Sequence, residues 1–184
     1  MERPEVSKVS IRQEKTEDHP KVLQLLEEAF KDQEFSDHRE HELVQRLRTD
    51  VNFVPELSIV AEMNNQLAGY ILLTEIFIAG PEGSHKSLAL APVAVGSSFQ
   101  KKGIGSKLIM HAHQRARDLG YTSIVVIGHE NYYPKFGYQP AHEFKITFPF
   151  KVPERNAFVL ELEKDALLGV QGKVIYADAF LEAE

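Results

Sequence analysis

Apolar and polar positions along the chain follow two periods, of about two and about 3.6 residues, which predict strands and helices. The segment Val6–Gln13 alternates apolar and polar residues and is predicted to be a half-exposed strand. The helix after it begins at Thr16 or Asp18, both good capping residues. Its apolar residues share one face: Val22, Leu25, Leu26, Ala29 and Phe30. A second helix is predicted over Glu40–Arg48.

Further strands are predicted where apolar runs are bounded by turn residues. They cover Leu57–Glu62, Leu67–Phe77, Ser87–Val95, Ser123–Ile127, Phe144–Phe148, Ala157–Leu162 and Val174–Ala177. Asn64 and Asn65 are typical of a hairpin turn between the first two. A long helix runs from Ile104 to about Leu119, and Gly120 is well placed to end it. This order predicts a single mixed α/β (α+β) domain over residues 1–184.

The segment between the strand ending at Val95 and the long helix carries the pattern Gln-x-x-Gly-x-Gly, at Gln100, Gly103 and Gly105. Backbone N–H groups at the start of a helix form a pocket for anions, which the helix dipole reinforces. Glycines let the backbone approach a bulky phosphate, because they lack a Cβ. The segment therefore predicts a binding site for a phosphorylated ligand.

Two better-known phosphate-binding patterns do not fit this segment. The Walker pattern needs a second glycine five residues after the first, but Lys101 stands five residues after Gly96. The dinucleotide-binding pattern starting at Gly103 fails because Leu108 replaces its third glycine. These spacings exclude a Walker loop and a dinucleotide-binding loop, so the segment is expected to bind a phosphorylated ligand of another class.

Composition narrows the classes of protein further. The chain has 184 residues, 43% of them hydrophobic, a formal net charge of −6 and no cysteine. The negative charge argues against a nucleic-acid partner, and the missing cysteines exclude disulfides and a cysteine nucleophile. The polar start has no secretory signal, and no apolar run is long enough to cross a membrane. We expect a cytoplasmic protein without a membrane or nucleic-acid partner.

The eight histidines do not predict a metal site. His38 and His41 lie three apart on a predicted helix, and His111 and His113 lie two apart on another. Residues two apart on a helix point to different faces, and no His-Glu-x-x-His pattern occurs. We interpret these histidines as polar residues of helix surfaces and expect no bound metal.

A longer series of motifs resembles the GNAT acetyltransferase superfamily, and within it the YhbS-like subgroup of predicted N-acetyltransferases. The series is the strand, the Gln-Lys-Lys-Gly-Ile-Gly loop, the helix, Gly120-Tyr121, the buried strand and the Tyr-Tyr-Pro-Lys-Phe-Gly-Tyr segment at Tyr132–Tyr138. It is most specific between about Leu88 and Pro140. The resemblance implies a mostly antiparallel mixed sheet with a splayed central parallel pair, flanked by helices.

The resemblance also implies acetyl-CoA as co-substrate and direct transfer of its acetyl group to an amine. Backbone groups of Val93, Ala94 and Val95 would face the pantetheine arm. The residues implied to hold the pyrophosphate are Gln100, Lys101, Lys102, Gly103, Ile104, Gly105 and Ser106, mainly through backbone amides. Tyr133, four residues before Gly137, is implied to donate a proton to the leaving thiolate, with Tyr132 as the second candidate.

Several points remain open at the level of sequence. Glu62 and Glu75 are candidates for a base on central strands, and His129 and Glu130 follow a strand expected to line the cleft. The acceptor is either a small-molecule amine or a protein amine, and a homodimer is one option for the assembly. The alternative function is a non-catalytic module that binds an acyl-CoA as a sensor or scaffold.

Overall fold

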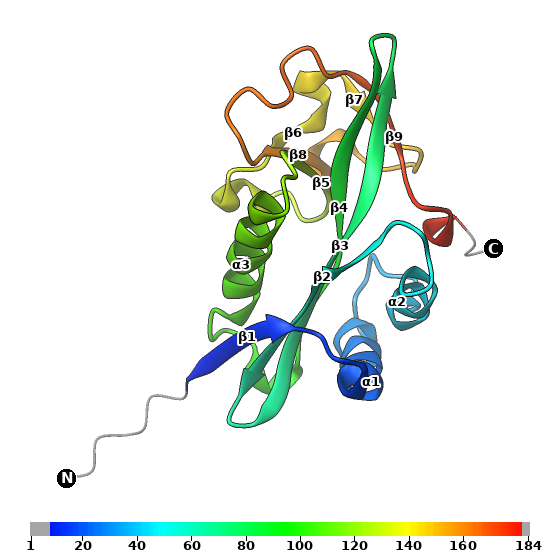
Figure 1. Ribbon diagram of the computed structural model, residues 1–184. Helices are drawn as coiled ribbons and strands as arrows, with labels where there is room; N and C mark the ends of the chain where they lie inside the picture. The colour runs from blue at the N-terminus through cyan, green and yellow to red at the C-terminus, as the bar shows by residue number, and fades with distance from the viewer. Residues whose placement is uncertain (1–7, 182–184) are drawn as a thin grey trace.

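The computed structural model describes residues 8–181, and in this part of the chain nine strands form one sheet (Figure 1). The order along the sheet is β1-β2-β3-β4-β5-β8-β6, and β9 pairs with β3 and β7 off this path. The strands are β1 Val9–Gln13, β2 Phe53–Met63, β3 Gln66–Gly80, β4 Gly83–Val95, β5 Ser123–Ile127, β6 Gln139–Pro140, β7 Ile146–Thr147, β8 Ala157–Glu161 and β9 Gly172–Ile175. The α-helices are α1 His19–Phe30, α2 Glu40–Leu47 and α3 Ile104–Asp118. Short 3-10 helices cover Thr16–Asp18, Ser97–Phe99, Tyr133–Phe136, Ala141–Phe144, Glu154–Asn156 and Asp178–Phe180.

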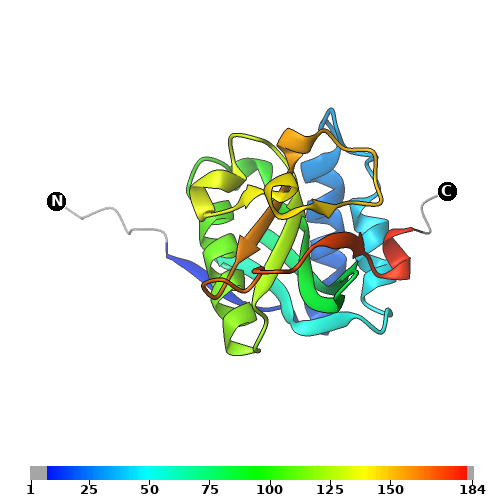
Figure 2. The same ribbon diagram turned by 90° about the horizontal axis from the view of Figure 1, so that it is seen from above.

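The sheet is covered on both faces (Figures 1 and 2). α3 packs on one face through a cluster that includes Leu108 and Ile109, both fully buried. α1 and α2 pack on the other face, where Leu26 and Val44 are fully buried. Burial on both faces explains why the central strands read as nearly continuous apolar runs.

The centre of the sheet contains a parallel pair that separates early. β4 and β5 pair at only two positions, Leu88 with Ile124 and Ala89 with Val125. β4 continues beside β3 to its end, with a bulge in the part of the strand that contains Pro92. A second short parallel pair joins β7 and β9, and all other pairs are antiparallel. The predicted mixed sheet with a diverging parallel pair is confirmed.

Most predicted elements are present, and the central strands extend beyond the predicted limits. The turn at Asn64 and Asn65 has φ of 52° and 59°, as a two-residue hairpin requires. The strand predicted over Phe144–Phe148 is wrong, because a 3-10 helix ends at Phe144 and β7 has only two residues. His38 lies before α2 with φ of 60°, so its predicted place on a helix is also wrong. The predicted strand start at Val6 lies outside the described residues.

A buried ionic network ties the end of α2 to the sheet. The Arg48 guanidinium pairs with the Glu14 carboxylate, and both side chains are at most 10% exposed. The other Glu14 oxygen accepts a hydrogen bond from Ser58 Oγ at 2.6 Å, and Ser58 Oγ lies 2.8 Å from Tyr70 Oη. Removing one partner of such a pair leaves a buried charge uncompensated, so the network holds α2 firmly in place.

The inner face of α3 carries a histidine that the sequence places on the surface. His113 is 2% exposed, and its Nε2 lies 2.9 Å from Tyr138 Oη, which is also buried. The helical period explains this, because His113 shares its face with Ile109 and Ala116. Burial, with a smaller contribution from the positive charge of Arg117, lowers the pKa of His113 to about 4.

We expect His113 to make the free energy of unfolding depend on pH. Its pKa falls from an ordinary 6.5 to about 4 in the folded protein, so only the unfolded chain binds a proton between these values. The contribution is complete above pH 6.5 and is lost progressively as the pH falls toward 4. Urea unfolding at about pH 7.5 and about pH 5 should show a larger loss for the wild type than for His113→Gln. Equal losses in the two proteins would contradict this role.

Candidate active site

The loop between β4 and α3 presents free backbone donors. Lys101 and Gly103 have φ of 61° and 77°, which turns the chain sharply into the helix. The Lys107 N–H bonds to the Gly103 carbonyl at 3.1 Å. The N–H groups of the first helical turn, at Ile104, Gly105 and Ser106, precede this bond and have no carbonyl partner inside the helix. These groups and the helix dipole together can bind a phosphate.

Lysine side chains stand around this loop in solvent. Lys101, Lys102 and Lys107 are all exposed. Lys102 Nζ lies 5.7 Å from the centre of the Phe99 ring. Within residues 8–181, neither Lys101 nor Lys102 forms an ion pair with a carboxylate. Their positive charge is therefore available to an anion bound at the loop.

The last residues of β4 have one unpaired edge. Val93, Ala94 and Val95 pair with β3, but β5 ends its pairing with β4 at Ala89. Backbone groups that point away from β3 therefore have no strand partner. An extended ligand with amide groups can bond to such an edge as an additional strand would.

Two neighbouring tyrosines occupy different environments after β5. The Tyr133 ring is 7% exposed and covers Gly128, where a Cβ atom would lie 2.1 Å from the ring. It stands nearly perpendicular to the rings of Tyr132 and Tyr138, at 5.2 Å and 5.5 Å between centres. Burial raises the pKa of Tyr133 well above its usual range, so its hydroxyl stays protonated at neutral pH.

Tyr132 reaches toward the start of α3 instead. A Cβ atom on Gly105 would lie 3.0 Å from Tyr132 Oη. Burial raises the pKa of Tyr132, and a hydrogen bond from the Ser106 side chain lowers it by less. The spacing within the Tyr-Tyr segment gives no sign of this contact, because it depends on how the segment after β5 folds back against α3.

The candidate bases on the central strands have other partners. Glu62 accepts a hydrogen bond from Arg12 at 2.7 Å. Glu75 accepts one from Tyr121 at 2.6 Å and lies 3.4 Å from Lys86 Nζ. Neither carboxylate lines the two hollows described below. Both therefore act as structural partners on their strands.

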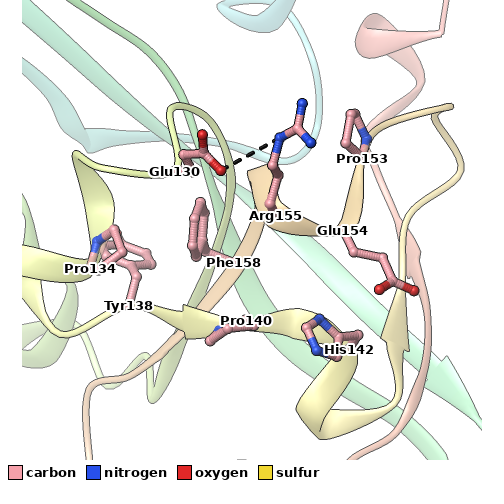
Figure 3. Close-up of a pocket in the computed structure, with 9 residues that line it drawn as sticks. All are labelled: Glu130, Pro134, Tyr138, Pro140, His142, Pro153, Glu154, Arg155 and Phe158. Atoms are coloured by element: carbon pink, nitrogen blue, oxygen red, sulfur yellow. Dashed lines mark ion pairs between the residues drawn. The ribbon is translucent and has the colours of Figure 1, made fainter.

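A surface hollow of about 710 Å³ lies beside β6 and β8 (Figure 3). Glu130 and Arg155 form an ion pair at its side, with 3.5 Å between Oε2 and Nε. Its lining residues are Glu130, Pro134, Tyr138, Pro140, His142, Pro153, Glu154, Arg155 and Phe158. None of them belongs to β4 or to the loop before α3, so this hollow stands apart from the free N–H groups at the start of α3.

The smaller hollow, of about 410 Å³, opens where β4 and β5 separate. Leu90, Ala91 and Pro92 of the β4 bulge line it, together with Ile127 at the end of β5. The other walls are formed by the segment between α1 and α2, by α2 itself and by three aromatic residues, Phe150, Tyr176 and Phe180. Despite its smaller volume, this hollow is the candidate site for a second substrate, because it adjoins the unpaired edge of β4.

Two further findings concern metal binding and membrane-spanning helices. Among residues 8–181, histidine and carboxylate side chains nowhere gather in threes as metal ligands would. No helix in the same part of the chain has both the length and the apolar character needed to cross a membrane.

Comparison with known proteins agrees with this architecture. Residues 19–138 match the model of the acetyltransferase (GNAT) family. The uncharacterized N-acetyltransferase YjhQ of Escherichia coli K12 is 32% identical over 123 residues, which cover 66% of this chain and 68% of YjhQ. The uncharacterized N-acetyltransferase YhbS of the same strain is 28% identical over 149 residues, covering 79% of this chain and 86% of YhbS.

Solved structures extend the likeness to the whole chain. The Escherichia coli YhbS structure in complex with CoA has a TM-score of 0.88 and 25% identity, over 100% of this chain and 98% of that one. A GNAT acetyltransferase from Brucella melitensis in complex with acetyl-CoA has a TM-score of 0.76 and 29% identity, over 95% and 99%. Given the diverging β4–β5 pair, the glycine loop at the start of α3 and these matches, this chain belongs to the acetyltransferase (GNAT) family.

Proposed function

We propose that this protein transfers the acetyl group of acetyl-CoA to an amine. The observation that carries the proposal is one continuous path: free N–H groups at α3, then the unpaired edge of β4, then the hollow at the β4 bulge. The path suits a ligand with phosphates at one end and an amide-containing arm at the other. The complexes of similar structures with CoA and acetyl-CoA support this choice of ligand.

Each part of the path has a proposed role. The backbone from Gln100 to Ser106 holds the pyrophosphate. The exposed side chains of Lys101 and Lys102 add positive charge near it. Gly103 and Gly105 keep the loop open, and Ile104 contributes its N–H while its side chain is buried in the core. Val93, Ala94 and Val95 bond to the pantetheine arm through their backbone.

The transfer itself is a direct displacement in this proposal. The neutral amine nitrogen attacks the thioester carbonyl, a C–N bond forms, the C–S bond breaks, and the thiolate leaves. The nitrogen gives up its extra proton to solvent water. Pro92 has no N–H, so a backbone donor to the carbonyl oxygen comes from a neighbouring residue of β4 such as Val93. Tyr133, the proton donor that the resemblance of its segment implies, gives its proton to the thiolate and is reprotonated from solvent.

Binding of acetyl-CoA should depend on backbone amides more than on lysines. A carboxylate placed among these amides repels phosphate, so Gly105→Asp should weaken acetyl-CoA binding by at least about tenfold, or 1.4 kcal/mol. An acidic residue in the first turn favours the helix itself, so the variant is expected to fold. Its Cβ would lie 3.0 Å from Tyr132 Oη, which must shift slightly, so Gly105→Asn is the matched control with the same bulk and no charge. Changing both Lys101 and Lys102 to Ala should cost less than about fivefold, because exposed charges contribute little.

Isothermal titration calorimetry with acetyl-CoA measures both effects, and thermal unfolding checks the fold. A wild-type protein that binds no acetyl-CoA would refute the proposed function. A double lysine variant weaker than Gly105→Asp would show that side chains, rather than amides, hold the phosphates.

The role of Tyr133 can be separated from that of its neighbour. Tyr133→Phe removes the proton donor and should lower kcat by about a hundredfold, with little change in the KM for acetyl-CoA. Tyr132→Phe is the matched control and should affect mainly the KM for acetyl-CoA, because Tyr132 Oη lies near Gly105. Thiol release under steady-state conditions gives both constants. The opposite pattern would assign the proton donor to Tyr132.

A further inference from the structure

One wall of the smaller hollow is built from aromatic rings of the C-terminal part of the chain. The centres of the Phe150 and Tyr176 rings lie 4.9 Å apart, and those of Tyr176 and Phe180 lie 5.0 Å apart. Burial raises the pKa of Tyr176 well above its usual range, so this ring carries no charge at neutral pH. Together with Leu90 and Ile127, which also line the hollow, these rings offer an uncharged, apolar surface.

The same hollow is also lined by a carboxylate that can accept further hydrogen bonds. Glu40, at the first position of α2, accepts a hydrogen bond from Ser36 Oγ through one oxygen. Its other oxygen, Oε2, is buried and has no partner among the described residues. Within residues 8–181 the Glu40 carboxylate forms no ion pair, so its negative charge is not neutralised and remains available to a cation bound in the hollow.

The charges around the hollow favour a cation. Asp37 and Glu40 line it, and Arg46 is its one lining residue that carries a fixed positive charge. The Arg46 guanidinium is already engaged, with Nε donating to the Ala179 carbonyl at 3.1 Å and Nη1 lying 3.9 Å from Glu42. The balance of available charge is therefore negative.

We propose, building on the acetyl transfer described above, that the acceptor is a small primary amine with an apolar body of about ring size. Its ammonium group first binds beside the Glu40 carboxylate, and its body packs against Phe150 and Tyr176. The nitrogen then gives up a proton to solvent water and attacks the thioester as a neutral amine. A volume of about 410 Å³ suits a small molecule. An acceptor with its own carboxylate is disfavoured by Asp37 and Glu40, and a polyamine leaves the aromatic wall without an apolar partner.

The first test compares acceptors at saturating acetyl-CoA by measuring thiol release. The probes are 2-phenylethylamine, ethylamine, spermidine, L-phenylalanine and a lysine-containing peptide. The kcat/KM for 2-phenylethylamine should exceed each of the others by at least about tenfold, because only this amine uses both the carboxylate and the aromatic wall. A higher value for spermidine, phenylalanine or the peptide would overturn the proposed acceptor class.

The second test uses variants of the two walls. Glu40→Gln should raise the KM for 2-phenylethylamine roughly ten- to hundredfold, the loss typical of a charge-assisted bond, without a similar change for acetyl-CoA. Glu27→Gln is the matched control, since Glu27 is an exposed carboxylate on α1 outside the hollow. Phe150→Ala should reduce the preference for 2-phenylethylamine over ethylamine. An unchanged KM in Glu40→Gln would remove Glu40 from the acceptor site.

Calorimetry keeps the two proposals distinguishable. Titration of 2-phenylethylamine into the protein with CoA bound should show binding that Glu40→Gln weakens by at least about tenfold. Absence of acetyl-CoA binding overturns the acetyl transfer and, with it, this acceptor class. Binding of acetyl-CoA, together with preferred acetylation of a different acceptor, overturns the acceptor class alone.

Discussion

The early separation of β5 from β4 is the constraint on which the proposed site depends. β4 stays paired with β3 to Val95, but its pairing with β5 ends at Ala89, while the other edge of β5 pairs with β8 along the whole of β5. The cost of an unpaired strand edge in the middle of a sheet is justified only if another group bonds to it. The same divergence opens the smaller hollow at the β4 bulge. The unpaired edge of β4 and the hollow beside it therefore have one structural origin.

The walls of that hollow are positioned by contacts far from it. Arg48 and Glu14 fix the end of α2, and thereby the place of Glu40 at its start. On the other side, β9 approaches β3 so closely that a Cβ on Gly172 would lie 2.0 Å from the Ala79 carbonyl. β9 leads directly into Tyr176, so this close packing sets the aromatic wall. Residues widely separated in the chain thus meet at one cavity.

The two adjacent tyrosines show that packing can place the same kind of side chain in two different surroundings. Tyr133 points into an aromatic cluster with Tyr138 and Phe158, whereas Tyr132 points toward Gly105 at the start of α3. Tyr138 in turn bonds to the buried His113 of α3. The short segment after β5 is therefore held against α3 by buried rings and one polar contact, which gives each tyrosine a defined direction.

The sequence by itself determined most of the elements, their order and the glycine loop before α3, because these follow from local periodicity, turn residues and glycine spacing. It also indicated the family through the loop and the Tyr-Tyr segment together. Only the tertiary structure decided that His113 is buried, that Glu62 and Glu75 are occupied by other partners, and that Glu40 has an unpaired oxygen. Those facts depend on contacts between residues far apart in the chain, such as His113 with Tyr138 and Glu75 with Tyr121, and contacts of that kind leave no local periodicity in the sequence.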